Sequence, residues 1–363
     1  MLTKHRVPRG TFLDVFSGTS IVAQMARLDG FTVTANDWQA YSHVLQRAFL
    51  ETDGYPAFAA LLEAEPAIAR AEALRVRPGF GLAKDPGFAP ETLPLRRVLA
   101  WLEDLAPTEG PFSAAYCEGG EAGRNYFSCT NGGRCEAVRD MIAAWQAAGL
   151  LSEAEHAVLV ASVIETMDLL ANTASVYGAF LKHVKKSAQA PFVLRAPRLA
   201  RPDGLPHRAC REDGLALVER LAPGDPIDVL YVDPPYNHRQ YHANYHVLET
   251  IARWDLASFT PRGKTGLRPD DGQRSPFCSR REVAQAFARL IGQANVRHVL
   301  ISYNHEGLLP EAELLAILQA KANGGTIDPH KIAYKRFRAD SDHAGRQYKA
   351  DAVSEFLFYA EVR

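Results

Sequence analysis

Short apolar runs that close on an acid recur along the chain and predict strands of a parallel sheet. The first run, TFLDVF (11–16), is followed by the polar turn SGTS and by an apolar-periodic stretch that reaches Gly30. The next run, FTVTAND (31–37), again closes on an acid. A strand, a glycine turn, a helix and a second strand make one βαβ unit, which favours a parallel sheet flanked by helices.

The same pattern returns in the second half of the chain. Later strand-like runs are PFVL (191–194), HRAC (207–210), DVLYV (228–232) and VRHVLISY (296–303). KIAYKRF (331–337) and VSEFLFYAEV (353–362) flank a charged stretch and predict an antiparallel hairpin. We therefore expect a Rossmann-like α/β sheet that ends in an antiparallel hairpin.

Helical periodicity dominates the region between the two groups of strands. It covers residues 38 to about 80 and about 95 to 187, with a loop rich in Pro and Gly over 78–94. Ser152 and Glu155 have the spacing of a capping box and mark the start of one helix. We expect a helical insertion within the sheet domain.

Composition narrows the classes of protein without changing this picture. The 363 residues suffice for one large or two ordinary domains, and the net charge of -1 means that any contact with a polyanion needs locally segregated positive charge. The five cysteines form no CxxC pair, which suits a reducing cytoplasm. No apolar run is long enough to span a membrane, and no His and Cys group has a trusted metal-ligand spacing.

The turn after the first strand is a candidate cofactor site. Gly18 lets a ligand approach the backbone closely, and Asp37, nineteen residues on, closes the second strand where an acid can hold ribose hydroxyls. A single glycine is also compatible with an ordinary strand–helix turn. Because the GxGxxG triplet of a pyrophosphate binder is absent, the pattern favours a nucleoside cofactor without a diphosphate, such as S-adenosylmethionine.

The run DVLYVDPPY (228–236) places Asp233 at the carboxyl end of a strand, the edge where open α/β sheets bind ligands. The two prolines stiffen the corner, and Tyr236 adds a flat ring beside it. An oxygen of the Asp233 carboxylate and the Pro234 carbonyl can accept both hydrogens of the exocyclic amino group of a nucleobase. These two contacts orient the amino nitrogen for attack. The base must leave the duplex stack to reach such a corner, where an aromatic ring replaces the lost stacking.

These motifs together resemble the D12 class of DNA adenine methyltransferases. The resemblance lies in DVFSGTS (14–20), ANDW (35–38), REDGLALVERL (211–221), DPPY (233–236), NYHVLETIA (244–252), GKTGLR (263–268), SPFC (275–278), SYNHEGLL (302–309), NTASVYGAFLK (172–182) and YKRFRADSD (334–342). It implies a Rossmann-like fold for S-adenosylmethionine-dependent methyl transfer and covers most of the chain. Ser20 stands where the family often has a second glycine.

The resemblance assigns roles residue by residue. The catalytic residues are Asp233, Pro234, Pro235 and Tyr236. The cofactor-binding residues are Phe16, Ser17, Gly18, Thr19, Ser20, Asp37, Trp38 and Asp213, the last beside the cofactor adenine. The implied catalytic domain is discontinuous, residues 1–80 and 191–363, and the helical insertion, 81–190, is a candidate for DNA recognition.

Local positive charge marks the expected DNA contacts, because phosphate contacts set affinity and salt dependence. The segment 237–281 directly follows the catalytic corner and is expected to face DNA. The expected DNA-binding residues are Lys182, Lys185, Lys186, Arg239, Gln240, Tyr241, Lys264, Arg268 and Arg274. For any one of them a solvated basic surface is an alternative interpretation.

The leading hypothesis is methyl transfer to N6 of a flipped adenine in duplex DNA. Transfer to N4 of cytosine remains open, since both targets are amino groups beside a ring nitrogen. A DNA-binding protein without catalysis and a nicotinamide oxidoreductase are two further hypotheses. The resemblance also implies a cytoplasmic, nucleoid-associated location and a possible partner restriction endonuclease. It leaves the recognition sequence and the oligomeric state open.

Overall fold

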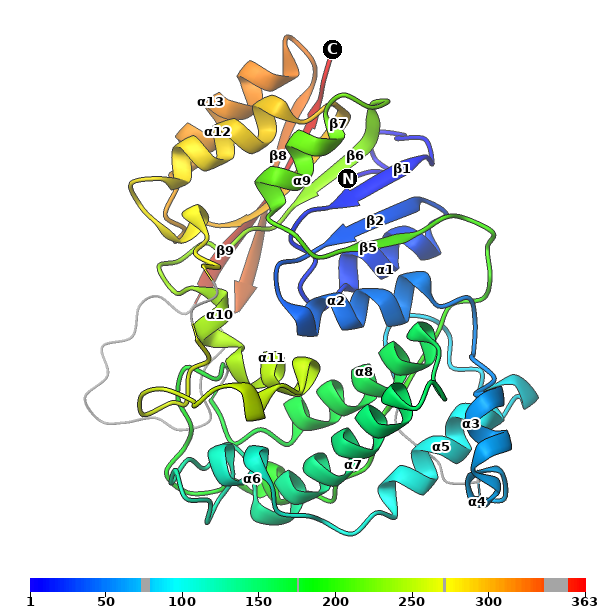
Figure 1. Ribbon diagram of the computed structural model, residues 1–363. Helices are drawn as coiled ribbons and strands as arrows, with labels where there is room; N and C mark the ends of the chain where they lie inside the picture. Colours follow the sequence, from blue (N-terminus) through cyan, green and yellow to red (C-terminus); the bar gives the residue numbers. More distant parts are fainter. Residues whose placement is uncertain (73–78, 175, 270–271, 336–351) are drawn as a thin grey trace. The chain divides into compact units, whose positions relative to one another are not determined.

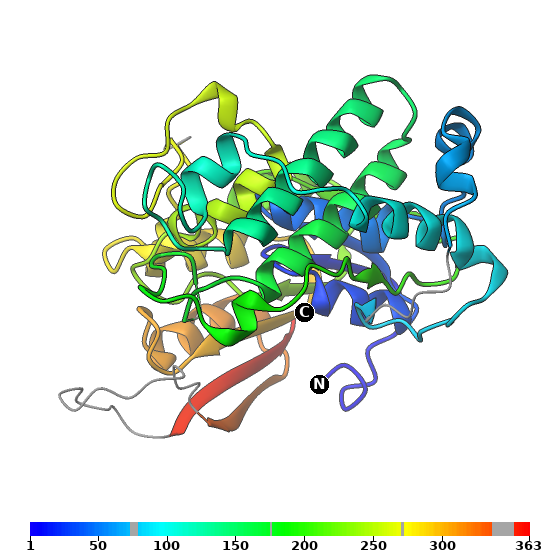
Figure 2. The ribbon, with the colours of Figure 1, turned by 90° about the horizontal axis from the view of Figure 1, so that it is seen from below.

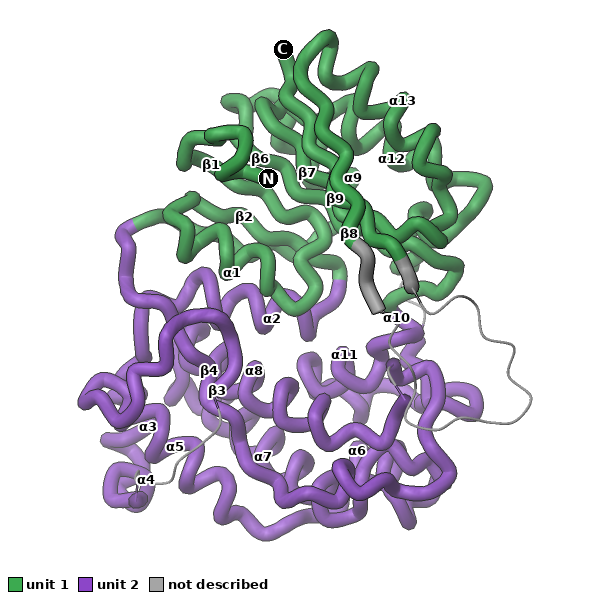
Figure 3. Tube along the Cα trace, turned by 180° about the vertical axis from the view of Figure 1, so that it is seen from behind, with its two compact units in different colours: residues 1–38, 205–241, 272–363 green, residues 39–204, 242–271 purple. Residues whose placement is uncertain are grey.

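The computed structural model describes residues 1–72, 79–174, 176–269, 272–335 and 352–363. The chain forms two compact units (Figure 3). Unit 1 consists of residues 1–38, 205–241 and 272–363, and unit 2 consists of residues 39–204 and 242–271. None of the helices in these described stretches is long and apolar enough to cross a membrane.

Unit 1 is built on a seven-stranded sheet with the strand order β5-β2-β1-β6-β7-β9-β8 (Figure 1). The strands are β1 (Thr11–Asp14), β2 (Thr32–Asn36), β5 (Arg208–Cys210), β6 (Ile227–Val232), β7 (Val296–Asn304), β8 (Ile327–Lys335) and β9 (Ala352–Glu361). Neighbours from β5 to β7 are parallel, whereas β9 is antiparallel to both β7 and β8.

The expected Rossmann-like sheet with a C-terminal hairpin is thereby confirmed. The hairpin strands β8 and β9 lie side by side at the end of the sheet (Figure 2). Residues 336–337 of the predicted hairpin lie outside the described residues. β1 is the middle one of the five parallel strands. The carboxyl ends of β1, β2 and β6 therefore lie at one edge of the sheet, where the sequence motifs also lie.

Three helices of unit 1, residues 214–221, 283–293 and 311–322, cover one face of the sheet (Figure 1), and their apolar side chains pack against it. The unit contains α1 (Ile21–Leu28), α9 (Gly214–Leu221), the short turn η5 (Pro276–Cys278), α12 (Val283–Gln293) and α13 (Glu311–Ala322). Leu13, Leu230 and Ile301 point from the strands into a buried cluster with α9, α12 and α13. Because strand side chains alternate, the residues between them face the other side.

Unit 2 is mostly helical and buries its own apolar cluster. Its elements are α2 (Ala40–Gln46), the π-helical turn η1 (Arg47–Glu51), α3 (Ala59–Ala64), α4 (Pro66–Ala69), β3 (Gly79–Phe80), η2 (Pro90–Thr92), α5 (Leu93–Glu103), α6 (Pro111–Tyr116), α7 (Cys129–Ala147), α8 (Glu153–Leu169), η3 (Lys186–Gln189), β4 (Ala196–Pro197), α11 (His246–Arg253) and η4 (Leu256–Ser258). The chain passes between the units within α10 (Tyr241–Asn244). The predicted capping box at Ser152 and Glu155 is present at the start of α8.

One predicted strand is wrong. PFVL (191–194) is irregular, and the two-residue strand β4 begins only at Ala196. Side chains rather than a strand partner hold this segment, because the Leu194 N–H donates to Glu103 Oε1 at 2.7 Å. Residues 52–58 break the helical pattern expected over 38–80, of which residues 73–78 lie outside the described part.

The compact units and the sequence pattern divide the chain at different points. The predicted boundaries near residues 80 and 191 both lie inside unit 2. Of the predicted DNA-facing segment 237–281, residues 242–271 also belong to unit 2. A role of the helical insertion in DNA recognition remains a prediction.

Candidate active site

Strand register brings the sequence motifs to one edge of the sheet in unit 1. Asp14, the last residue of β1, pairs with Tyr231 of β6 and with Ala35 of β2. The catalytic motif therefore starts two residues beyond Tyr231, directly beside the glycine turn that follows β1. Asp14 and Tyr231 point away from the face covered by α9, α12 and α13, since their strand neighbours fill that core.

Asp14 is a buried acid at this edge for which the sequence predicted no functional role. Its side chain is 1% exposed, and neither carboxylate oxygen has a hydrogen-bond partner within the described residues. Burial, together with the negative charges of Asp233 and Asp37, raises the pKa of Asp14 to about 8. The Ser17 hydroxyl favours the charged form without reaching hydrogen-bonding geometry. The sequence signal was an acid inside the apolar run TFLDVF.

The turn after β1 is fixed by short-range backbone contacts and by Asp37. The Ser17 N–H donates to the Asn36 carbonyl at 2.9 Å, and the Ser20 N–H donates to the Ser17 carbonyl at 2.7 Å. The Gly18 N–H donates to Asp37 Oδ2 at 2.9 Å. Gly18 has φ 50, and a Cβ there would meet nothing within 4 Å. The space beside Gly18 is thus open to a ligand.

Ser20 adopts the left-handed conformation, with φ 66, at the start of α1. This is the region that favours glycine, the residue often found at this position in the family that the motifs resemble. The side chain is fully buried and its hydroxyl has no hydrogen-bond partner in the described structure. Ser20 therefore carries a backbone cost that a glycine would avoid. Thr19, beside it, is exposed.

Asn36 joins three segments of the site and was not selected from the sequence. Its buried amide donates to the carbonyls of Val15 and Glu212, each at 3.1 Å, and its Oδ1 accepts from the Glu212 N–H at 3.1 Å. These contacts fix the end of β2 against the end of β1 and the segment before α9. The only signal was its place in the ANDW motif.

The remaining predicted cofactor residues surround this turn. Asp213 caps α9, accepting the Ala216 N–H at 3.0 Å through Oδ1. Phe16 packs edge-on against Phe277, with ring centroids 5.1 Å apart. Trp38 is half-buried, and its carbonyl accepts from Gln273 Nε2 at 3.2 Å. All eight predicted cofactor residues therefore belong to unit 1, although one oxygen of Asp213 is used to cap its helix.

The DPPY corner follows β6 at the same edge. Pro234 and Pro235 are buried, whereas Asp233 is open to solvent and Tyr236 is 40% exposed. The Leu308 N–H donates to the Tyr236 carbonyl at 3.0 Å, which fixes the corner to the turn after β7. The motif SYNHEGLL (302–309) thus supports the catalytic corner from the neighbouring strand.

The charge of Asp233 depends on its surroundings. Burial of the carboxylate by the surrounding protein, together with the charge of Glu355, raises the pKa of Asp233 to about 6. Hydrogen bonding from the Tyr231 and Ser302 side chains lowers it. Solvent nevertheless reaches Asp233, and this access limits the rise of its pKa.

Predicted DNA-binding residues in unit 1 differ in how exposed they are. Arg239 and Arg274 are exposed, and Tyr241 is half-buried at the start of α10. The amide of Gln240 makes two hydrogen bonds to the backbone of Ser275, at 2.9 and 3.3 Å. Gln240 therefore joins the segment after the corner to the segment before η5.

The predicted DNA-binding residues of unit 2 also fall into two groups. Lys182, Lys186 and Lys264 are exposed, while the Lys185 ammonium donates to the Thr173 carbonyl at 2.9 Å. Arg268 is only 9% exposed. Its guanidinium makes two hydrogen bonds to Asp255, at 2.7 and 2.8 Å, and lies 4.4 Å from the Phe259 ring centroid. Arg268 thus holds Asp255 and Phe259 in place, and its contact with DNA stays a prediction.

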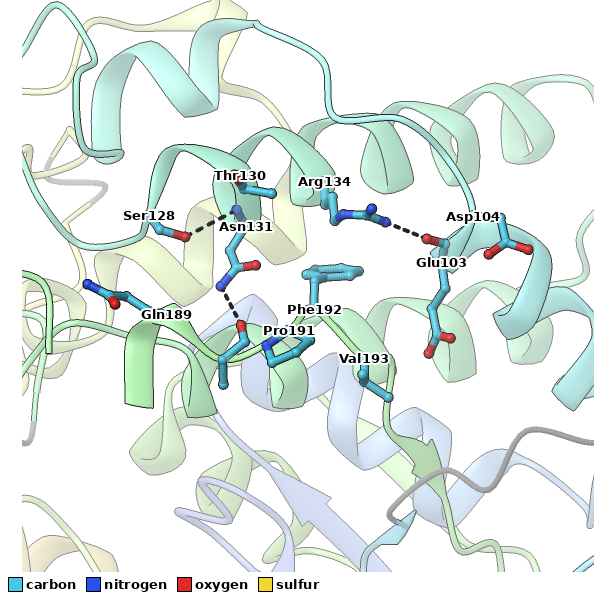
Figure 4. A pocket seen from close by; sticks show the side chains of 11 residues that line it. Glu103, Asp104, Ser128, Thr130, Asn131, Arg134, Gln189, Pro191, Phe192 and Val193 are labelled. Atoms are coloured by element: carbon cyan, nitrogen blue, oxygen red, sulfur yellow. Dashed lines mark hydrogen bonds between the residues drawn. The ribbon is translucent and has the colours of Figure 1, made fainter. Parts of the chain in front are cut away.

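A separate cavity of about 760 Å³ lies within unit 2, between the end of α5, the start of α7 and the segment after η3 (Figure 4). Asn131 Nδ2 donates to the carbonyls of Ala188 and Ala190, at 3.1 and 3.0 Å. Arg134 donates to the Glu103 carbonyl. Because these polar groups bind neighbouring backbone, we assign Asn131 to holding η3 and the residue after it, and Arg134 to holding the end of α5.

Comparison with known proteins shows which family the chain belongs to. The family model of the D12 class N6 adenine-specific DNA methyltransferases matches residues 2–316. The chain belongs to this family. It is an S-adenosylmethionine-dependent, site-specific DNA methyltransferase that modifies adenine at N6, and the N4-cytosine alternative is not favoured.

Three curated relatives show how far the similarity extends. The type II methyltransferase M.NlaIII of Neisseria lactamica is 35% identical over 357 residues, 98% of this chain and 92% of the relative. M.FokI of Planomicrobium okeanokoites is 33% identical over 350 residues, 96% of this chain and 48% of the relative. M.CviAII of Paramecium bursaria Chlorella virus 1 is 28% identical over 359 residues, 97% and 90% of the two chains. No solved structure matches.

Proposed function

We propose that the DPPY corner is the catalytic site of this methyltransferase. The Asp233 carboxylate and the Pro234 carbonyl accept the two hydrogens of the adenine N6 amino group, which orients its nitrogen for attack. Tyr236, partly exposed at the corner, stacks on the extruded base, and Pro235 keeps the backbone rigid. The supporting observation is the place of Asp233 at the sheet edge, next to the turn after β1.

The turn after β1 is the proposed cofactor site. S-adenosylmethionine supplies the methyl group when it is bound. The residues present fit a cationic nucleoside: Gly18 faces open space, Asp37 brings a carboxylate that can accept ribose hydroxyls, and Asp14 offers a buried carboxyl without a partner in the described structure. A positive charge beside three acids also offsets their mutual repulsion. Phe16, Ser17, Thr19, Trp38 and Asp213 complete the proposed site.

DNA contact is proposed for the exposed basic residues alone. Lys182, Lys186 and Lys264 in unit 2 and Arg239 and Arg274 in unit 1 present charge to solvent, as phosphate contacts require. Lys185 and Gln240 are proposed to hold these segments in shape, since their polar ends bind backbone carbonyls. Tyr241 lies beside Gln240 at the start of α10 and remains a candidate contact.

Methyl incorporation into defined duplexes tests the proposed catalytic role. Asp233→Asn and Asp233→Ala should reduce transfer of tritiated methyl groups at least a thousandfold, while S-adenosylmethionine binding in calorimetry persists. Asp225→Ala, in the exposed turn before β6, is the matched control and should keep full activity. Full activity of Asp233→Asn would overturn the proposal, and N4-methylcytosine in the product would contradict the base assignment.

We further propose that the enzyme protects host DNA against a cognate restriction endonuclease. The support is that its relatives are named type II methyltransferases and modification methylases. Methylome sequencing of a host expressing the protein should give one N6-methyladenine motif. Genomic DNA from that host should resist an endonuclease of the same specificity and be cut when Asp233→Ala is expressed instead.

A further inference from the structure

Two hydroxyl groups lie near the Asp233 carboxylate on the same face of the sheet. Tyr231 precedes Asp233 by two residues on β6, so both side chains point to the face opposite the helix-covered core. Tyr231 Oη and Asp233 Oδ2 are 3.5 Å apart. Ser302 of β7 lies close enough to both side chains to lower their pKa values. Because Val232 pairs with Ile301, Ser302 on β7 lies level with Asp233.

An acid on β9, the antiparallel strand beyond β7, acts on the Asp233 carboxylate. Glu355 of β9 pairs with Asn304 of β7 and its charge acts on both Asp233 and Tyr236. The other titratable groups that face Asp233 are Asp14 on β1, Tyr231 on its own strand and Tyr236 in the corner. Two hydroxyl groups and neighbouring acids thus act on the Asp233 carboxylate in opposite directions.

We propose that Tyr231 and Ser302 are positioning residues whose hydroxyls hold the Asp233 carboxylate ionised and turned toward the substrate amino group, and that Glu355 opposes them. This proposal rests on the role of Asp233 given under the proposed function. An acceptor of N–H hydrogens must be unprotonated and fixed in direction. The long Tyr231–Asp233 distance is consistent with a bond that tightens when substrate arrives.

The sheet also provides a matched control. Tyr359 of β9 is on the same face and nearly fully buried, as Tyr231 is. Its hydroxyl bonds His298 Nδ1 at 3.0 Å, and its ring stacks on His5 with centroids 3.8 Å apart. Tyr359→Phe removes a buried hydroxyl from the same sheet without touching Asp233, so it reports what such a loss does to folding alone.

The test compares pH profiles of kcat and kcat/KM for wild type, Tyr231→Phe, Ser302→Ala, Glu355→Gln and Tyr359→Phe. In wild type the acid limb should lie near the Asp233 pKa of about 6. Loss of either hydroxyl should lower kcat about tenfold, with KM for S-adenosylmethionine within about twofold of wild type, and should move the acid limb to higher pH. Glu355→Gln should move the limb to lower pH, and Tyr359→Phe should leave it in place.

These opposite shifts distinguish positioning from general damage, since instability alone moves both limbs of a profile inward. Unchanged profiles for Tyr231→Phe and Ser302→Ala, together with an inactive Asp233→Asn, would overturn the positioning proposal and leave the proposed function intact. An active Asp233→Asn would overturn the proposed function itself. If Tyr231→Phe fails to fold in thermal melts, Ser302→Ala, at a half-buried position, decides the outcome.

Discussion

Asp37 Oδ2 accepts the backbone N–H of Gly18 at 2.9 Å, so the acid that ends the second strand also fixes the turn after the first. The contact joins two motifs nineteen residues apart and holds Gly18 in a left-handed conformation beside open space. A carboxylate has about four acceptor positions, so one that accepts a backbone N–H can also accept ribose hydroxyls. One side chain thereby shapes the turn and, under the proposed function, also binds the cofactor.

Asp37→Ala should weaken S-adenosylmethionine binding by roughly tenfold to a hundredfold, because both the support of the turn and a charged acceptor are lost. Titration calorimetry measures the effect. Asp29→Ala, an exposed acid at the end of α1 whose contact to Arg9 uses only its backbone carbonyl, is the control. Equal dissociation constants for Asp37→Ala and wild type would contradict the assignment of the turn as the cofactor site.

Ser20→Gly should stabilise the protein by about 1 kcal/mol, because it relieves a left-handed residue and removes a buried hydroxyl that has no partner within the described residues. Denaturant unfolding measures the gain. Ser20→Ala keeps the backbone cost and isolates the effect of the hydroxyl. If Ser20→Gly instead loses cofactor affinity, the hydroxyl serves as a ligand-binding group and the explanation by strain is wrong.

Asp14→Asn should make stability less dependent on pH. The pKa of Asp14 is 3.8 in the unfolded chain and about 8 in the folded protein, so the folded state keeps the proton more tightly. This proton contributes its full stability below pH 3.8, and the contribution is lost as pH rises through 8. The stability advantage of Asp14→Asn over wild type should therefore grow by roughly 2–5 kcal/mol between about pH 4 and pH 8.5. An advantage that is constant over this range would show that the carboxyl is solvated.

Lys182→Ala combined with Lys186→Ala should weaken DNA binding and reduce its salt dependence by about one counterion for each lysine replaced. Fluorescence anisotropy at several salt concentrations measures the slope. Arg268→Ala is the contrast: it should lower the free energy of unfolding by about 1–3 kcal/mol through the loss of its bonds to Asp255, with an unchanged slope for the folded fraction. A reduced slope for Arg268→Ala would return that residue to the DNA surface.

Much of the fold was predictable because strand and helix signals are local. Alternating or apolar runs located the strands of unit 1, and the capping box at Ser152 located the start of α8. The prediction failed for PFVL, where the apolar run is irregular and its Leu194 N–H is bonded to the Glu103 side chain, ninety-one residues away in the chain. A sequence pattern carries no information about a partner that distant.

The sequence by itself determined the chemistry of two turns, SGTS with Asp37 and DPPY, because the residue types and backbone constraints that define them are readable from short stretches of chain. Only the tertiary structure decided that Asp14 lacks a partner in the described sheet, that Asn36 joins three segments, and that Arg268 is bonded to Asp255. Burial and pairing depend on which strands and loops become neighbours, and packing of the whole chain sets that choice.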